Sequence, residues 1–156
     1  MLFAAAFEPG PEGRKTFLLS GATLLMLALA LPASWLALNS GLPPVKLANL
    51  QQALWMLVCA PVIEEVVFRR ILQKNLGDFL SQRFSQHSAA VCAALISAVV
   101  FALCHGYRVG PQWMVLWLVP GLALAEIWRR ERSVWICILV HAYFNGSIWI
   151  TGVSWT

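Results

Sequence analysis

The chain has 156 residues, of which 60% are hydrophobic and 12% charged, and its mean hydropathy is +0.72. A soluble domain carries about a quarter charged residues, so this chain has too few polar side chains to cover a water-facing globule. The high apolar fraction also excludes disordered, collagen-like and disulfide-stapled proteins. The net charge is +4, but no basic run with interleaved aromatic residues indicates a nucleic-acid partner. We therefore expect an all-α, polytopic transmembrane helical bundle.

Residues 1–15, which include Pro9, Gly10 and Pro11, are expected to form a cytoplasmic N-terminal segment, followed by a single membrane-embedded domain over 16–156. An apolar run over about 16–38 is long enough to cross about 30 Å of hydrocarbon. Arg14 and Lys15 before this run would also suit a signal peptide, but the run lacks a small-residue cleavage site. The run is therefore predicted to be a retained transmembrane helix.

A turn rich in Pro, Gly and Asn at 39–44 separates this first helix from the rest of the chain. Four further helices are expected: an apolar run from about 50 that continues as an amphipathic stretch over 68–80, and spans over about 89–105, 112–127 and 134–151. A tight turn at 106–111 and a charged break at 128–133 should bound the fourth span. Pro120 and Gly121 predict a kink within it.

The lysines and arginines give these five helices an orientation. With the N-terminus in the cytoplasm, nine of the 11 lie on the cytoplasmic side and two, Lys46 and Arg108, lie outside. Membrane proteins concentrate positive charge on the cytoplasmic side, so the N-terminus is predicted inside and the C-terminus outside. The four cysteines show no CxxC spacing and are expected to be small buried residues. Tryptophans near span ends are expected in an interfacial belt: Trp35, Trp113, Trp128, Trp149 and Trp155.

Two adjacent glutamates interrupt the second apolar run. Each charge held at mid-bilayer costs about 2.5–3.5 kcal/mol, and neighbouring carboxylates repel, so Glu64 and Glu65 need a reason to be there. Arg69 follows Glu65 by four residues, the spacing of an ion pair on one helical face, whereas Glu64 points about 100° away. We predict that Arg69 neutralises Glu65 and that Glu64 faces a cavity. Pro61 offers no N–H to the carbonyl of Leu57, which should loosen the helix just before the glutamates.

Two histidines lie in later spans, each four residues from a partner on the same face. Phe101 precedes His105 in the third span, and Asn145 follows His141 in the fifth. Histidine protonation changes readily near neutral pH, and a glutamate with a histidine can deprotonate water. Histidine and asparagine can hold the negative oxygen that then develops. Together these groups are a minimal set for amide hydrolysis without a covalent intermediate.

These residues resemble the signature of the CAAX protease and bacteriocin-processing family, the Rce1-like intramembrane glutamic proteases. The matching motifs cover about 50–150, the expected catalytic core, and lie in the family's order on three helices: Glu64-Glu65-x-x-x-Arg69, Phe101-x-x-x-His105 and His141-x-x-x-Asn145. Each motif alone is weak, but all three in order within an apolar chain are a strong signal. The departure is one of length, because many members carry more N-terminal helices.

The resemblance implies a role for each matching residue. Glu64 would be the catalytic carboxylate, His105 its partner in activating water, and His141 with Asn145 the oxyanion site. Three residues would support them: Glu65 and Arg69 would shape and neutralise the site, and Phe101 would pack beneath His105. No cofactor or metal is implied.

The resemblance also implies a substrate class. This would be a membrane-tethered or membrane-spanning polypeptide, cut near one face of the bilayer. Eukaryotic relatives imply a prenylated C-terminus, whereas a prokaryotic member would trim a bacteriocin, a signalling peptide or a C-terminal sorting tail. Such a chain would be a multi-pass protein of a prokaryotic cytoplasmic membrane, in contact with lipid. The sequence leaves the oligomeric state open.

Other interpretations of the same residues remain open. Glu65 with Arg69 would also serve as a structural ion pair, His105 as a helix cap, and His141 with Asn145 as interhelical hydrogen-bonding groups. Two histidines and a glutamate would suit zinc, although no HExxH motif occurs. A non-enzymatic membrane carrier or immunity protein would use the same polar cluster to bind a proton or a peptide.

The catalytic interpretation imposes one geometric condition. Glu64 lies about 14 residues, or about 21 Å, into its helix, whereas His105 lies near the outer end of its own span. They meet only if the second helix runs well into the cytoplasm or if the site is a wet cavity.

Overall fold

The computed structural model describes residues 21–39, 50–110 and 114–152, and every ordered element within these ranges is helical. It contains five helices: α2 (Gly21–Asn39), a continuous rod (Leu50–Leu80), α6 (Gln86–Val109), α7 (Met114–Glu131) and α8 (Val134–Gly152). The all-α prediction is confirmed. Two segments are long and apolar enough to cross a membrane, Leu50–Leu80 and Gln86–Tyr107. The five-span count and the cytoplasmic N-terminus stay predictions.

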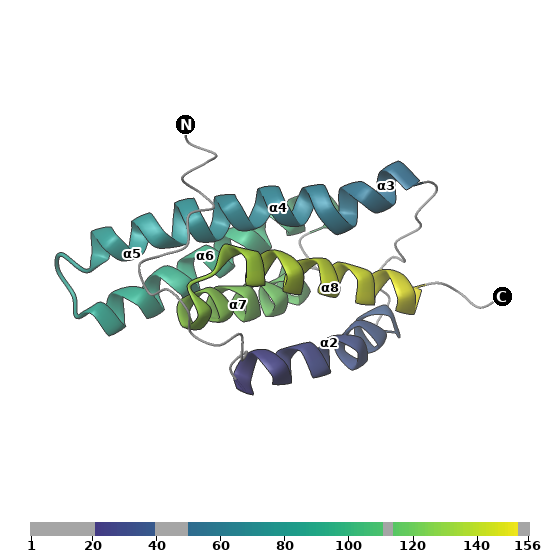
Figure 1. Cartoon of the computed structure of the whole chain (residues 1–156), viewed down its shortest axis with the longest axis horizontal. Helices are drawn as coiled ribbons and strands as arrows, with labels where there is room; N and C mark the ends of the chain where they lie inside the picture. Colours follow the sequence, from purple (N-terminus) through teal and green to yellow (C-terminus); the bar gives the residue numbers. More distant parts are fainter. Residues whose placement is uncertain (1–20, 40–49, 111–113, 153–156) are drawn as a thin grey trace.

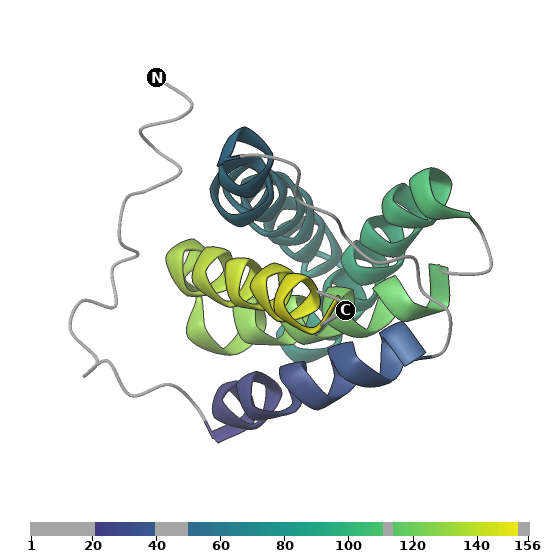
Figure 2. The same ribbon diagram turned by 90° about the vertical axis from the view of Figure 1, so that its right-hand side faces the viewer.

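The rod forms one side of the molecule and α2 the other, with α7 and α8 between them (Figure 1). The end-on view in Figure 2 shows the same order, with α8 lying between the rod and α2. Helix α8 contacts α2, α7 and the rod. Its buried side chains therefore have neighbours from more than one helix.

The rod changes its helical type along its length. Its segments are α3 (Leu50–Leu54), the π-helical η1 (Trp55–Cys59), α4 (Ala60–Glu65), the π-helical η2 (Val66–Gln73) and α5 (Lys74–Leu80). The wide turn of η1 ends directly before Pro61, where the backbone N–H of Ala60 bonds to the carbonyl of Trp55, five residues back. The loosening predicted before the glutamates is confirmed, because a proline cannot continue the normal ladder of hydrogen bonds.

The rod and α6 form an antiparallel hairpin that brings distant residues together. The side chain of Ser85 caps α6 by accepting a hydrogen bond from the N–H of Ser88. Glu64 precedes Ser85 by 21 residues and His105 follows it by 20, so the two arms carry them to the same level. The 31-residue rod is about 45 Å long, against about 30 Å of hydrocarbon. The rod is thus longer than the hydrocarbon is thick, as one form of the condition on their meeting requires.

Two predicted boundaries are wrong by several residues. Helix α6 continues through the turn expected at 106 and ends at Gly110, whose φ is 113°. Helix α7 continues into the charged stretch expected to break it, because Glu126 pairs with Arg129 and Arg130 within the helix. It ends at Glu131, just before Arg132, which has a φ of 52°.

Small residues let α6 and α7 approach closely. A Cβ atom on Gly121 would lie 3.1 Å from the carbonyl oxygen of Ala98 and 3.2 Å from Cδ1 of Phe101. Ala94, Ala98 and Ala125 form a buried cluster at this contact. Helix α7 runs through Pro120 without interruption, so the predicted Pro-Gly feature lies inside one helix, where its glycine serves packing.

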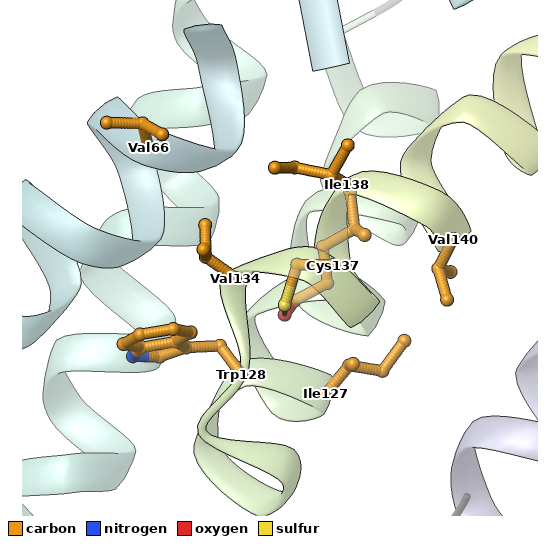
Figure 3. Packing of buried hydrophobic residues seen from close by; sticks show 8 residues of the cluster. Val66, Ile127, Trp128, Val134, Cys137, Ile138 and Val140 are labelled. Atoms are coloured by element: carbon orange, nitrogen blue, oxygen red, sulfur yellow. Dashed lines mark hydrogen bonds between the residues drawn. The ribbon is translucent and has the colours of Figure 1, made fainter. Parts of the chain in front are cut away.

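The main hydrophobic core lies where the rod, α7 and α8 meet (Figure 3). Its buried members are Val66, Leu124, Ile127, Trp128, Val134, Cys137, Ile138 and Val140. Trp128, expected in the interfacial belt, is only 4% exposed, so that prediction is wrong: its indole fills the space beside Val134. Trp35 is 61% exposed and Trp149 is half-buried, while Trp113 and Trp155 lie outside the described residues.

The expected burial of the cysteines holds for one of them. Cys137 is buried, whereas Cys59, Cys92 and Cys104 are exposed on the outer faces of the bundle. An outward thiol has little cost in lipid, because free cysteine behaves as a small apolar side chain. Side chains that face lipid and side chains that face other helices are equally apolar, so hydropathy did not separate buried from outward positions.

Candidate active site

Side chains from three helices converge at the middle of the rod. Oε2 of Glu64, on α4, lies 3.4 Å from Nε2 of His105 on α6 and 3.7 Å from Nε2 of His141 on α8. The side chains of Glu64 and His105 are 27% and 20% exposed, and that of His141 is 6% exposed. One carboxylate oxygen therefore lies beside two imidazole nitrogens. This Oε2 atom is itself buried, whereas the rest of the Glu64 side chain is partly exposed.

Glu65 lies behind this cluster and is fully buried. Its Oε1 lies 2.8 Å from Nδ1 of His141, and its Oε2 lies 3.0 Å from Nε of Arg69. The ion pair predicted from the spacing of Glu65 and Arg69 is present. Both carboxylate oxygens are used, so Glu65 holds the imidazole of His141 in a fixed orientation.

The guanidinium of Arg69 is also fully buried, and polar groups from three helices surround it. It donates to Oγ of Ser97 at 2.9 Å, to Oε1 of Gln73 at 3.4 Å and to the carbonyl of Gly121 at 3.4 Å. It also lies over the ring of Phe101, with Cζ 5.7 Å from the ring centroid. A buried charge is tolerated when it is paired and its donors are satisfied. Arg69 thus links the rod to α6 and α7 beneath the site.

Sequence reasoning missed Ser97 and Gln73. Gln73 continues the four-residue spacing of Glu65 and Arg69 along the same face, a signal that was available. Ser97 lies four residues before Phe101 in an alanine-rich span, and its hydroxyl donates to the carbonyl of Phe68 at 3.0 Å. Nothing local in the sequence indicates that this serine accepts from an arginine on another helix.

The ring of His105 is held by an aromatic stack and a backbone carbonyl. It stacks on Phe101 with ring centroids 4.2 Å apart, as expected of a residue packing beneath it, and Trp117 lies 4.9 Å away on α7. Nδ1 of His105 lies 2.9 Å from the carbonyl oxygen of Phe101. A carbonyl oxygen only accepts hydrogen bonds, so Nδ1 carries the proton and donates it. Nε2, beside Glu64, is the nitrogen whose protonation can change.

The same assignment applies to His141. Its Nδ1 donates to the carboxylate of Glu65, because that oxygen is an acceptor already paired with Arg69 through its neighbour. Nε2 of His141 is therefore the nitrogen that faces Glu64. Both histidines turn the exchangeable nitrogen toward one carboxylate, an arrangement suited to taking up and returning a proton.

The side chain of Asn145 bonds to the backbone of the rod. Its amide donates to the backbone carbonyl of Met56, 2.8 Å away in η1. That carbonyl has lost its helical partners: the N–H of Ala60 bonds to Trp55, and Pro61 has no N–H. Asn145 therefore satisfies an acceptor that the proline leaves open, one turn along α8 from His141.

Trp117 is a further residue that the sequence did not indicate. Its indole packs beside His105, and its Nε1 is buried without a hydrogen-bond partner among the described residues. A buried N–H without an acceptor costs about 1–3 kcal/mol. It lies four residues before Gly121, on the face of α7 turned toward α6, and this spacing was the available signal.

Comparison with known proteins identifies the family. Residues 46–147 match the Type II CAAX prenyl endopeptidase Rce1-like family, a range that includes every motif residue described above. The chain belongs to the Rce1-like family. The recognition made from the three motifs is thereby confirmed.

A relative from Bacillus subtilis supports this Rce1-like assignment. The chain is 26% identical over 88 residues to the "Putative membrane peptidase YdiL" of strain 168. The match covers 56% of this chain and 32% of that protein, so the chain spans about a third of its relative's length. No solved structure matches the chain.

A metal-binding interpretation of this Rce1-like site depends on the same cluster. Within residues 21–39, 50–110 and 114–152, no three His, Cys, Asp or Glu side chains are arranged to hold a metal ion. A zinc ion would have to take its ligands from Glu64, His105 and His141, the residue types that zinc binds, after their side chains had moved from the positions seen here.

Proposed function

We propose that the chain is a membrane-embedded endopeptidase of the glutamic type, a multi-pass protein of a prokaryotic cytoplasmic membrane. It hydrolyses a peptide bond with water and forms no covalent intermediate. The observation that carries this proposal is the position of the Glu64 carboxylate between the Nε2 atoms of His105 and His141. Membership of an Rce1-like protease family supports the same conclusion.

Water attack begins at Glu64 and His105. A water molecule hydrogen-bonded to both gives a proton to the carboxylate, and its oxygen attacks the carbon of the scissile carbonyl. The stack of His105 on Phe101 and its bond to the Phe101 carbonyl keep Nε2 aimed at that water. The proton then moves to the amine leaving group as the C–N bond breaks.

The negative charge that develops on the carbonyl oxygen needs donors. His141 supplies Nε2–H when its ring is protonated, with Glu65 holding Nδ1 in place. Asn145 carries a second amide N–H besides the one bonded to Met56.

The substrate is a membrane-tethered or membrane-spanning polypeptide. A prenylated C-terminus, a bacteriocin, a signalling peptide and a C-terminal sorting tail all belong to this class. The apolar residues on the outer faces of the bundle favour a protein that meets such substrates within lipid. The printed name of the Bacillus relative, a membrane peptidase, is consistent with this class.

Proteolysis by the purified full-length chain tests this proposal. Candidate membrane peptides are incubated with wild type and with Glu64→Gln, each with and without a chelator. We expect Glu64→Gln to lower turnover by about 10²–10⁴-fold, because general-base catalysis contributes about that much, and the chelator to have no effect. Glu131→Gln is the matched control, since glutamine still offers an oxygen to the hydroxyl of Thr23.

Each contrary result has a distinct meaning. Activity abolished by the chelator in wild type would favour a zinc protease using the same three side chains. Full turnover by Glu64→Gln would contradict the glutamic mechanism. A wild type that binds peptide without cutting it, and a Glu64→Gln variant that binds equally well, would indicate a non-enzymatic carrier or immunity protein.

A further inference from the structure

A second polar cavity lies at the hairpin end of the bundle. Its volume is about 210 Å³, and its walls come from α5, the start of α6 and the junction of α7 with α8. Lys74 in its wall lies ten residues beyond Glu64 along the rod, which is about 15 Å. This cavity is therefore distinct from the candidate active site.

The cavity carries an excess of positive charge. Its lining contains three cationic side chains, Lys74, Arg129 and Arg132, and one carboxylate, Asp78. Lys74 and Asp78 pair at 2.7 Å on the rim, where their side chains are 45% and 66% exposed. Arg132 adds a charge that forms no ion pair with the described part of the chain. Arg129 is itself paired with Glu126, at 2.6 Å and 2.7 Å, so Arg132 carries the positive charge of the lining that no carboxylate of the described residues balances.

The inner wall of the cavity is polar and fixed. Gln73 is 4% exposed, donates to the carbonyl of Ala125 at 3.0 Å and accepts from Arg69 at 3.4 Å. Its amide is therefore held in one orientation by both of its ends. A polar wall with cations around its mouth suits a compact, hydrated anion better than an apolar chain.

The position of the cavity indicates where such an anion comes from. The connections between α5 and α6 and between α7 and α8 lie at this end. They and the adjoining helix ends carry arginines and lysines that the positive-inside rule assigns to the cytoplasmic side, Arg83 and Arg130 among them. Anionic lipid headgroups face protein at that boundary, and basic pockets between transmembrane helices bind them.

We propose that this cavity binds a phosphate group, supplied by an anionic phospholipid headgroup at the membrane surface. Arg132 supplies the unbalanced positive charge, while Lys74 and Arg129 add donors but stay paired with Asp78 and Glu126. Asp78 weakens phosphate binding by repulsion. Soluble phosphate shares this chemistry and is the other possible source. The proposal does not depend on protease activity.

Native mass spectrometry of the full chain tests this site. The protein is released from detergent micelles that contain equal amounts of phosphatidylglycerol and phosphatidylcholine, and the retained lipids are counted. We expect wild type to retain phosphatidylglycerol selectively, and Arg132→Gln to lower that binding about fivefold, since a basic side chain near a charged headgroup contributes about that factor. Asp78→Asn should act in the opposite direction, raising retention severalfold.

Arg83→Gln is the matched control. It removes the same charge from an exposed residue of the adjacent turn that does not line the cavity, so it should leave phosphatidylglycerol retention unchanged. An equal loss in Arg83→Gln and Arg132→Gln would overturn the proposal, as would equal retention of the two lipids by wild type. A fall rather than a rise in Asp78→Asn would overturn it too.

A second measurement separates the two sources of phosphate. Melting of the lipid-free protein is followed with and without inorganic phosphate at constant ionic strength. A rise in melting temperature that Arg132→Gln abolishes would assign the site to soluble phosphate. No rise, together with selective retention of phosphatidylglycerol, would assign it to lipid.

Discussion

Glu64 and Glu65 are neighbours with identical side chains in very different surroundings. One helical step turns their directions about 100° apart, so Glu65 points into the bundle while Glu64 points toward His105. Glu65 is fully buried and bonded through both oxygens, whereas the side chain of Glu64 is 27% exposed. Backbone geometry therefore gives two neighbouring carboxylates different degrees of burial.

The buried pair of Glu65 and Arg69 should dominate the stability of the site. Arg69→Met leaves the carboxylate buried without its cation, which costs about 3–5 kcal/mol of unfolding free energy. Glu65→Gln leaves the guanidinium of Arg69 buried without its anion, at a similar cost in unfolding free energy. The double variant should recover a large part of this loss, because neither charge then remains. Denaturant unfolding of the solubilised protein measures all three, and additive losses would contradict the expectation.

Residues that interact within one helix were predictable, and those that act across helices were not. The four-residue spacing of Glu65 and Arg69 indicates their ion pair directly. The contact of Arg69 with Ser97 depends on how two helices pack, and a lone serine among alanines carries no sign of it. Trp117 has the same character: its place beside His105 follows from the close approach of α7 to α6.

At the scale of the helix, one proline accounts for several features of the rod. Pro61 removes an N–H, the preceding turn widens into η1, and the carbonyl of Met56 is left for Asn145. A backbone irregularity thus determines the direction of a candidate catalytic side chain. The sequence indicated the loosening at Pro61 but not its partner on α8.

A double-mutant cycle tests this connection. Asn145→Ala should cost about 1 kcal/mol of unfolding free energy, the usual size of a hydrogen bond between transmembrane helices. In a Pro61→Ala background the loss should be smaller, because residue 61 then offers an N–H to the rod's own carbonyls. Unfolding of the four proteins in detergent gives the coupling energy. Equal losses in both backgrounds would contradict the link between Pro61 and Asn145.

Helix ends were the least predictable part of each element. The charged stretch 128–133 was predicted to be a break, yet Glu126 bonds to Arg129 and Arg130 one turn on, and the helix continues to Glu131. Helical pairs of this kind stabilise a charged turn that composition alone assigns to a loop. The chain breaks at Gly110 and Arg132, where φ is positive, and both residues lie near the end of the turns predicted at 106–111 and 128–133.

At the scale of the molecule, hydropathy predicted the helices of the described ranges but not which of their faces meet. The apolar faces of this chain look alike in sequence, whether they meet lipid or each other. For that reason the sequence did not predict that Trp128 lies in the core or that three cysteines face outward. The convergence of Glu64, His105 and His141 was expected only through the family resemblance, since no local pattern joins residues on three helices.

The predicted orientation can be measured on the whole molecule. The four native cysteines are replaced by alanine, and Arg83→Cys or Lys46→Cys supplies one label site. An impermeant maleimide should label position 46 in intact cells and position 83 only after permeabilisation, because the charge distribution puts these positions on opposite sides. The reverse pattern would place the N-terminus outside.

The π-helical stretch Val66–Gln73 directly follows the two glutamates. A π turn holds one more residue than the α turn it replaces, so the two types can interchange when a chain gains or loses a single residue. A deletion here could be absorbed by tightening the stretch, while the segments on either side kept their facing. The π-helical stretch would then accommodate a one-residue length change between Glu65 and the hairpin turn without rotating the helical segments on either side.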